Sequence, residues 1–175
     1  MSERGIGTDP AKVSAVRDWP VPSSSADVRS FLGCLGYYRR FIPAYSELAH
    51  PLTALLKKNV QFRWSGECQK AFEELKGRLV SSPILSCPTG GDTFILDTDA
   101  SKWGMGAVLQ QIQNGEEKVI SYGSKTFSKS QQAYCVTKRE LYAVIYFVQL
   151  YRHYLVAGHF VIRTDHASLK WLKGY

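Results

Sequence analysis

Two spacings of apolar residues divide this chain into two parts. In the first part, apolar residues recur every three or four positions, the spacing of a helix with one buried face. Helices are therefore predicted over residues 9–18, from Ser25 onward through SADVRSFLGCLGYYRRFI, over Tyr45–Lys57 with a His50-Pro51 junction inside it, and from Ser65 to Pro83. Residues 1–82 are expected to be mainly helical.

The pattern changes after SSPILSCPTGG (residues 81–91), where apolar and polar residues begin to alternate. Alternation predicts strands. The expected elements are strands over Phe94–Asp99, Gly106–Gln111 and Lys118–Lys125, a long helix from Ser130 or Ala133 to Tyr154, a strand over His159–Thr164, and a helix over His166–Lys173. The sequence QNGE at 113–116 predicts a hairpin turn. A helix between the third and fourth strands favours a mixed sheet with a right-handed crossover.

The predicted fold class is therefore α/β, with a helical region over 1–82 and a mixed sheet with a crossover helix over 83–175. The composition supports a folded protein, since 45% of the residues are hydrophobic and 13% aromatic. A net charge of +7 favours a polyanionic partner such as nucleic acid, although a soluble basic protein without such a partner has the same charge.

Four cysteines stand outside metal-binding spacing and are expected to be free thiols: Cys34, Cys68, Cys87 and Cys135. Free thiols are typical of a reducing compartment. The sequence has neither a signal peptide nor a membrane-length apolar run, so we expect an intracellular protein, cytoplasmic or nuclear, that does not contact a membrane.

Three acidic residues lie where the pattern predicts buried surface. Asp99 ends the first strand, Asp165 ends the fourth, and Glu140 directly precedes the apolar stripe of the long helix. That stripe is expected to consist of Leu141, Val144, Ile145, Val148 and Leu155. If the first and fourth strands are neighbours, the three carboxylates converge where ligands collect in open α/β sheets.

Converging carboxylates repel one another and require cations at neutral pH. Oxygen ligands suit Mg²⁺ or Mn²⁺, and two such ions about 4 Å apart can promote phosphodiester hydrolysis. Each acid also has an ordinary interpretation: Asp99 can cap a turn, Asp165 can cap the following helix, and Glu140 can be solvated.

Several long motifs give the chain a resemblance to a known family. GIGTDPAKVSAVRDWPVP, RSFLGCLGYYRRFIPAYSELAHPLTALLKK and QFRWSGECQKAFEELKGRLVSSPIL precede FILDTDASKWGMGAVLQQ, ISYGSKTFSKSQQAYCVTKRELYAV and IRTDHASLKWL. In this order they resemble the polymerase polyprotein of gypsy-type LTR retrotransposons, from the thumb-like end of reverse transcriptase into ribonuclease H. The resemblance covers nearly the whole chain.

The resemblance implies that Asp99, Glu140 and Asp165 are catalytic, metal-binding acids of an enzyme that cuts the RNA strand of RNA–DNA hybrids. Asp97, on the same strand face as Asp99, is interpreted as a neighbour of the metal ligands. The family's polymerase palm is not in this sequence, so no polymerase activity is expected. The family's nuclease continues with a helix, a strand and a terminal helix that supply a fourth acid, whereas this sequence ends at Tyr175.

Four further residues are candidates for contacting nucleic acid. Ser101 and His166 flank the acids, with local capping as the alternative for both. Arg39 and Arg40 follow two tyrosines, where guanidinium groups can meet phosphates or can simply be solvated. Gly104 and Gly106 fit a hairpin in which two backbones approach closely.

Three hypotheses follow. The first is a metal-dependent ribonuclease H. The second is a domesticated ribonuclease H-like module with little or no turnover, which acts through protein or nucleic-acid binding and forms an oligomer or has a protein partner that covers the incomplete sheet. The third is passive nucleic-acid binding by the basic helical part, which requires an affinity that falls steeply with salt.

Overall fold

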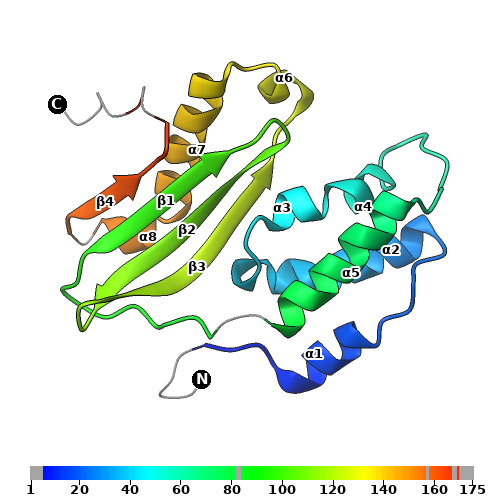
Figure 1. The fold of residues 1–175 in the computed structure, drawn as a ribbon, viewed down its shortest axis with the longest axis horizontal. Helices are drawn as coiled ribbons and strands as arrows, with labels where there is room; N and C mark the ends of the chain where they lie inside the picture. The colour runs from blue at the N-terminus through cyan, green and yellow to red at the C-terminus, as the bar shows by residue number, and fades with distance from the viewer. Residues whose placement is uncertain (1–5, 82–83, 157, 167–168, 170–175) are drawn as a thin grey trace.

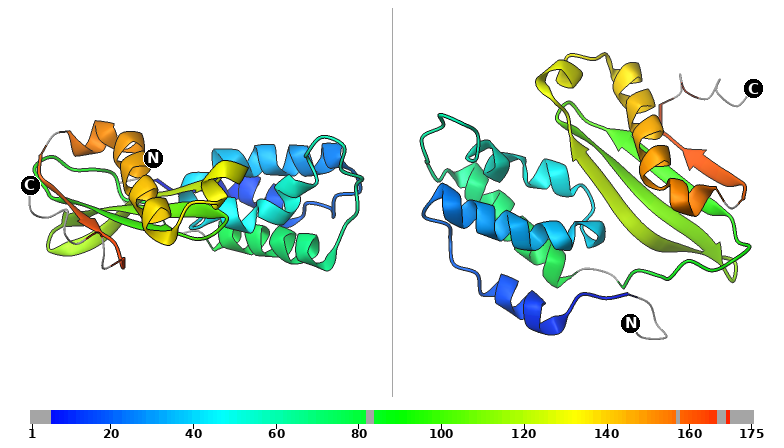
Figure 2. Two further views of the ribbon diagram at one scale, coloured as in Figure 1. Left: turned by 90° about the horizontal axis from the view of Figure 1, so that it is seen from above. Right: turned by 180° about the vertical axis from the view of Figure 1, so that it is seen from behind.

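The helical part of the chain lies beside a β-sheet, as all views in Figures 1 and 2 show. The computed structural model of the protein describes residues 6–81, 84–156, 158–166 and 169. The helices of the first part are α1 (Pro10–Arg17), α2 (Ser25–Tyr37), α3 (Tyr45–Leu48), α4 (His50–Ala54) and α5 (Gly66–Val80), with a 3-10 turn η1 (Arg39–Phe41) after α2.

Hydroxyl caps fix the beginnings of the two longer helices in this part. The side chain of Ser24 accepts a hydrogen bond from the Asp27 N–H, and that of Ser65 accepts one from the Cys68 N–H. The single helix predicted over Tyr45–Lys57 is wrong, because the chain forms the short helices α3 and α4 there. Pro51 lies in the first turn of α4, where its missing N–H costs no hydrogen bond.

The core of the helical part forms between α2 and α5. Phe31 and Phe72 are fully buried with ring centroids 4.7 Å apart, and Leu35 and Leu75 are buried in the same cluster. Leu85, beyond the last helix of this part, belongs to this core as well and forms an isolated antiparallel bridge with Ile6. The helical core therefore includes part of the connection that leads to the sheet.

The second part contains a four-stranded mixed sheet, as the sequence predicted, and the strand order is β3-β2-β1-β4. Its strands are β1 (Phe94–Ala100), β2 (Gly104–Gln113), β3 (Glu116–Thr126) and β4 (Phe160–Arg163). β1 pairs antiparallel with β2 and parallel with β4. Asn114 and Gly115 join β2 to β3 with positive φ angles of 54° and 81°, which suit a two-residue hairpin turn.

The crossover from β3 to β4 consists of three helices rather than the one helix that was predicted. They are α6 (Lys129–Gln132), α7 (Val136–Leu150) and α8 (Arg152–Leu155). Cys135 has an extended conformation at the start of α7, so the helix cannot continue from α6. Ser128 and Gln131 form a capping box that begins α6 separately.

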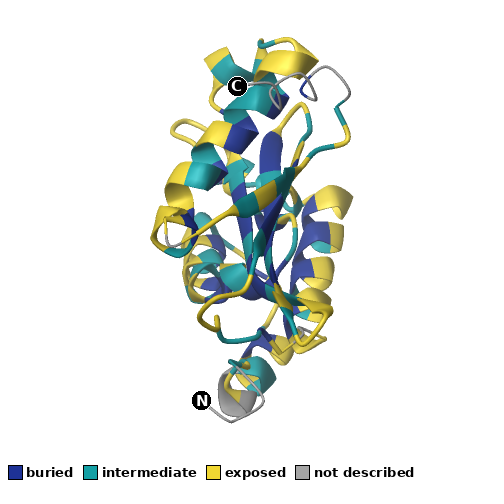
Figure 3. Cartoon of the chain, turned by 90° about the vertical axis from the view of Figure 1, so that its left-hand side faces the viewer, coloured by how far each residue is buried: buried dark blue, intermediate teal, exposed yellow. Residues whose placement is uncertain are grey.

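α7 packs across one face of the sheet, and its buried side differs from the predicted stripe. The buried residues of α7 are Glu140, Ala143, Val144 and Phe147. Ile145, assigned to the stripe, is 48% exposed, because it points away from the sheet contacts that Ala143 and Phe147 make. In Figure 3, buried residues gather along the strands and on the helix sides that face them.

The helical part covers the other face of the sheet near β3. Val119 and Tyr122 of β3 pack against the helical core, and Ser46 of α3 bonds to the Ser124 hydroxyl. The helix predicted over His166–Lys173 lies largely outside the described residues. Within the described part of the chain, no helix has the length and hydrophobicity needed to cross a membrane.

Candidate metal-binding active site

The pairing of β1 with β4 brings two of the predicted acids side by side. Asp97 is the register partner of Arg163 in this parallel pair, so Asp99 and Asp165 each follow two residues later, where the two strands end. Glu140 comes from α7, which packs on β1. Ligand oxygens of Asp99, Glu140 and Asp165 all lie within 4.8 Å of one another. The convergence expected from the sequence is therefore present.

Glu140 occupies the closed side of this cluster, whereas Asp99 and Asp165 are exposed. The Glu140 side chain is only 4% exposed, and its Oε1 accepts a hydrogen bond from the Ala100 N–H at 3.2 Å. Its Oε2 is buried and has no hydrogen-bond partner among the described residues. Burial and then the charge of Asp99 raise the pKa of Glu140, with a further contribution from Asp165. A cation bound here would offset both the desolvation of the buried Glu140 carboxylate and the repulsion among the three acids. The donor set therefore fits a divalent metal.

Arg139 and Ser101 shape the turn that follows Asp99. The Ser101 hydroxyl accepts hydrogen bonds from the N–H groups of Trp103 and Gly104, at 3.1 and 3.2 Å. Nη1 of Arg139 donates to the Ser101 carbonyl at 2.8 Å and thereby links α7 to this turn. The structure thus places the Ser101 hydroxyl within the turn beside the acids.

His166 follows Asp165 and contacts the first turn of α7. Its Nε2 lies 2.9 Å from the Thr137 hydroxyl, and its N–H donates to the Thr164 hydroxyl. These contacts hold the segment after β4 against α7. His166 therefore lies next to the acid cluster, with its side chain engaged in a contact of its own.

The two glycines of the β1–β2 hairpin differ in their surroundings. A Cβ atom on Gly104 would lie 2.8 Å from the Lys125 carbonyl oxygen, so this position requires glycine for close backbone approach. A Cβ on Gly106 would meet only the Gly123 carbonyl oxygen, at an ordinary 3.9 Å. The predicted close approach therefore holds for Gly104 and is wrong for Gly106.

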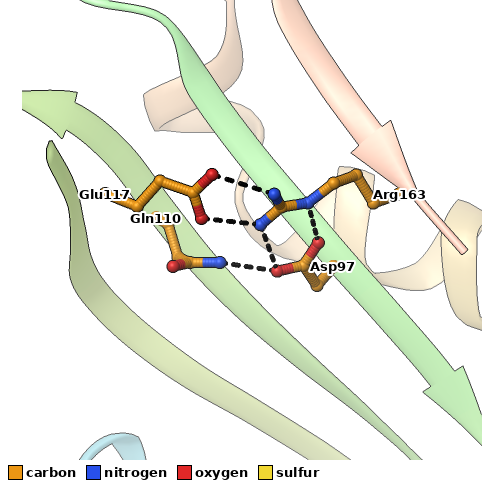
Figure 4. Close-up of polar contacts among 4 residues, drawn as sticks. All are labelled: Asp97, Gln110, Glu117 and Arg163. Carbon is orange, nitrogen blue, oxygen red and sulfur yellow. Dashed lines mark hydrogen bonds and ion pairs between the residues drawn. The ribbon is translucent and has the colours of Figure 1, made fainter. Parts of the chain in front are cut away.

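Asp97 is engaged elsewhere, on the face of the sheet away from α7. Figure 4 shows the Arg163 guanidinium between the carboxylates of Asp97 and Glu117. Arg163 donates to Asp97 at 2.5 and 2.8 Å and to Glu117 at 2.9 Å, and Gln110 also donates to Asp97. Hydrogen bonds to Asp97 and then Glu117 raise the pKa of Arg163. Asp97 is thus part of a polar cross-strand network on the sheet.

Comparison with known proteins agrees with the motifs and the fold. Residues 64–162 match the family described as the RNase H-like domain found in reverse transcriptase. The chain belongs to this family. The matched range begins before α5 and extends into β4.

Among the relatives of this reverse-transcriptase RNase H-like chain are polyproteins of gypsy-type transposons. It is 37% identical over 171 residues to the retrovirus-related Pol polyprotein from transposon 412 of Drosophila melanogaster, covering 98% of the chain and 14% of that polyprotein. It is 40% identical over 169 residues to the Pol polyprotein from transposon 297 of the same organism, covering 96% of the chain and 16% of the polyprotein. The chain therefore spans about one-sixth or less of the length of these relatives.

Solved structures of a foamy viral protease-reverse transcriptase share the fold. One, in complex with double-stranded DNA, gives a TM-score of 0.81 at 18% identity and covers 99% of this chain and 31% of its own. A second, in complex with an RNA/DNA hybrid, gives 0.80 at 18% identity and covers 98% of this chain and 24% of its own. The likeness extends over both the helical part and the sheet.

Arg39 and Arg40 of the RNase H-like chain lie at the junction between its two parts. Nη2 of Arg39 donates to the Ser124 carbonyl at 2.5 Å, and Nη2 of Arg40 donates to the Ile120 carbonyl at 3.4 Å. Both carbonyls belong to β3, so the two guanidinium groups link η1 to the edge of the sheet.

Two residues near the acids have no counterpart among the sequence predictions. Glu47 of α3 lines a hollow of about 40 Å³ together with Asp99 and Ser124. Arg139 directly precedes Glu140, and its contact with Ser101 could be suspected only from its place beside a candidate ligand. For Glu47 no sequence signal exists, because its position depends on how α3 docks on β2 and β3.

Proposed function

We propose that this chain hydrolyses the RNA strand of RNA–DNA hybrids, with Mg²⁺ or Mn²⁺ held by Asp99, Glu140 and Asp165. The observation that carries the proposal is the convergence of these carboxylates to within 4.8 Å, together with the unpartnered buried oxygen of Glu140. Three acids in this arrangement, in a chain of the reverse-transcriptase RNase H-like family, favour metal-dependent hydrolysis over a structural role.

Ribonuclease H-like domains generally use divalent metals, which activate a water molecule and stabilise the leaving oxygen of a phosphodiester. In this chain Glu140 forms the closed side of the site, whereas Asp99 and Asp165 face solvent, where a substrate can approach. Arg139 positions the turn after β1 through its bond to the Ser101 carbonyl. Ser101 and His166 flank the acids, so a nucleic-acid strand bound at the acids would pass beside both residues. This position supports a role for both in substrate contact.

The substrate part of the proposal rests on two supports. A structure with the same fold was solved in complex with an RNA/DNA hybrid. The net charge of +7 favours a polyanion, since lysine and arginine side chains that neutralise phosphates release counterions. The four cysteines are unpaired, which supports the further proposal of an intracellular location, cytoplasmic or nuclear.

Cleavage of a labelled RNA–DNA hybrid with Mg²⁺ or Mn²⁺ tests the proposal. Asp99→Asn should lower the cleavage rate by at least about 10²-fold, since it removes a charged ligand oxygen. Asp97→Asn is the matched control, because it makes the same chemical change two residues away in a carboxylate that Arg163 already neutralises. It should retain activity within about threefold of the unsubstituted chain, in line with the small effect of a half-exposed ion pair.

Cleavage that is equal in the unsubstituted chain and in Asp99→Asn would contradict the proposal. Hybrid binding without any metal-dependent cleavage would favour the second candidate, a binding module without turnover. The exposed Val161 on edge strand β4 supports that alternative, which predicts an oligomer or a stable partner on light scattering. A monomer that cleaves the hybrid would contradict it.

A further inference from the structure

A cleft separate from the acid cluster lies where the helical part meets β3 and the C-terminal half of α7. Its volume is about 330 Å³. Both parts of the chain and the short helix after α7 contribute to its lining, which includes Arg39, Arg40, Tyr122, Tyr146, His153 and Tyr154. The cleft therefore exists only when η1 is docked against the edge of the sheet.

The side chains that line this cleft are basic and aromatic. Two guanidinium groups and an imidazole face it, and none of the described residues that line it carries a carboxylate. Lys125 adds a further cation next to the cleft, with its Nζ 4.1 Å from the centre of the Tyr146 ring. A concave surface with cations and without acids attracts anions.

Arg40 has donor capacity that the protein does not use. Its Nη2 reaches the Ile120 carbonyl only at 3.4 Å, near the limit for a hydrogen bond. Its Nε is buried and has no hydrogen-bond partner among the described residues. Because the protein satisfies this charged group so poorly, an acceptor oxygen from a ligand on the cleft side of the guanidinium would stabilise this arrangement.

Tyrosine hydroxyls and aromatic rings also line the cleft. Burial raises the pKa of Tyr122, so its hydroxyl stays protonated and can donate a hydrogen bond at neutral pH. His153 and Tyr154 both line the cleft, with their ring centroids 4.0 Å apart and the rings tilted by 44°. Guanidinium groups beside aromatic rings suit a phosphate together with its attached sugar or base.

We propose that this cleft binds a phosphate group, with Arg40 as its principal donor and His153 and the tyrosines around it. The site is separate from the acid cluster and does not require hydrolysis. The phosphate belongs either to a polynucleotide backbone or to a free phosphate compound, because both present the same oxygens to the guanidinium. The assignment gives Arg40 a ligand-binding role in addition to its contact with β3.

Fluorescence anisotropy of a labelled RNA–DNA hybrid, measured in EDTA, tests the site without engaging metal at the acids. Arg40→Gln should weaken binding about five- to tenfold and reduce the salt slope by about 1. Arg40→Lys should restore most of the affinity, since it keeps the charge. Arg152→Gln is the matched control, because it removes the same charge from an exposed residue next to His153 that does not line the cleft.

A second experiment distinguishes the two sources of phosphate. The hybrid, inorganic phosphate or pyrophosphate is added to the chain, and the signals of the His153 ring are followed by NMR. A shift of His153 with the hybrid alone assigns the phosphate to a polynucleotide, and a shift with pyrophosphate assigns it to a free phosphate compound. Equal loss of hybrid affinity in Arg40→Gln and Arg152→Gln, with no His153 shift in either arm, would overturn the proposal.

Two further variants separate this site from folding and from hydrolysis. If Arg40→Gln lowers the melting temperature, His153→Gln repeats the test without disturbing the junction with β3, and it should weaken hybrid binding while Arg152→Gln does not. Asp99→Asn should bind the hybrid in EDTA as the unsubstituted chain does, whether or not the chain hydrolyses RNA. If Arg40→Gln and His153→Gln both leave the hybrid affinity unchanged, and pyrophosphate does not shift the His153 signal, the phosphate site alone is overturned.

Discussion

Two carboxylates on β1, two residues apart, lie in opposite electrostatic surroundings. Asp97 belongs to a network in which Arg163 supplies the opposite charge from within the chain. Asp99 belongs to a cluster with Glu140 and Asp165, and none of the ion pairs between described residues involves these three acids. On one strand, Asp97 thus helps to hold neighbouring strands together, whereas Asp99 belongs to a group of carboxylates without a cation partner in the described part of the chain.

This difference supports the proposal that an external cation binds at Asp99 rather than at Asp97. Around Asp97 the chain supplies its own cation, because the Arg163 guanidinium lies between two carboxylates. Around Asp99 the hydrogen bond from the Ala100 N–H offsets only part of the burial and repulsion that raise the pKa of Glu140. Adding a cation or changing the pH should therefore affect mainly the region of Asp99, and removing the internal cation mainly the region of Asp97.

Adding metal should produce the largest difference. At a Mg²⁺ concentration ten times the dissociation constant, binding stabilises the native state by about 1.4 kcal/mol, which raises the melting temperature of a chain of this size by about 3–6 °C. Differential scanning calorimetry of the unsubstituted chain should show this rise, and so should Asp97→Asn. In Asp99→Asn the rise should be absent, and its persistence there would mean that the metal binds elsewhere.

Changing the pH without metal should have a smaller effect, with a defined sign. Because the folded state raises the pKa of Glu140, its protonated form contributes stability below the unfolded value of 4.5, and this contribution is lost as the pH rises through the folded value. Glu140→Gln removes that loss. In EDTA at neutral pH, it should be more stable than the unsubstituted chain by about 1 kcal/mol, with the difference shrinking toward pH 4 in urea unfolding.

A Glu140→Gln variant that is less stable than the unsubstituted chain at neutral pH would contradict this account of Glu140. The same comparison with saturating Mg²⁺ should reverse the order of the two chains, since only the unsubstituted one retains all three ligand carboxylates. This reversal separates a metal ligand from a merely buried acid.

Removing the internal cation should have the smallest effect. Arg163→Gln breaks the ion pairs with Asp97 and Glu117, and the free energy of unfolding should fall by about 0.5–1 kcal/mol, since these charges are partly exposed. The loss should shrink at high salt, and RNA cleavage should be unaffected. Lys118→Gln, which breaks the more exposed pair with Glu116, is the control and should leave the urea midpoint unchanged.

Much of the fold and of the acid cluster could be predicted because both rest on short-range patterns. Alternation along β1, the turn at Asn114-Gly115 and the position of Asp165 after the fourth strand are properties of adjacent residues. The helix breaks were missed because they depend on local details that apolar spacing does not encode, such as the extended conformation of Cys135. The exposure of Ile145 was missed because the sheet, rather than the helix pattern, selects which side of α7 is buried.

By itself, the sequence determined a helical region followed by a mixed sheet, the family to which the chain belongs, and the three acids that meet at the ends of β1 and β4. Only the tertiary structure decided that Asp97 is neutralised by Arg163 and that Arg40 faces a basic cleft at the junction. The reason is physical: strand and helix patterns are set by neighbouring residues, whereas the partner of a charge depends on which distant segments the folded chain brings within a few ångströms.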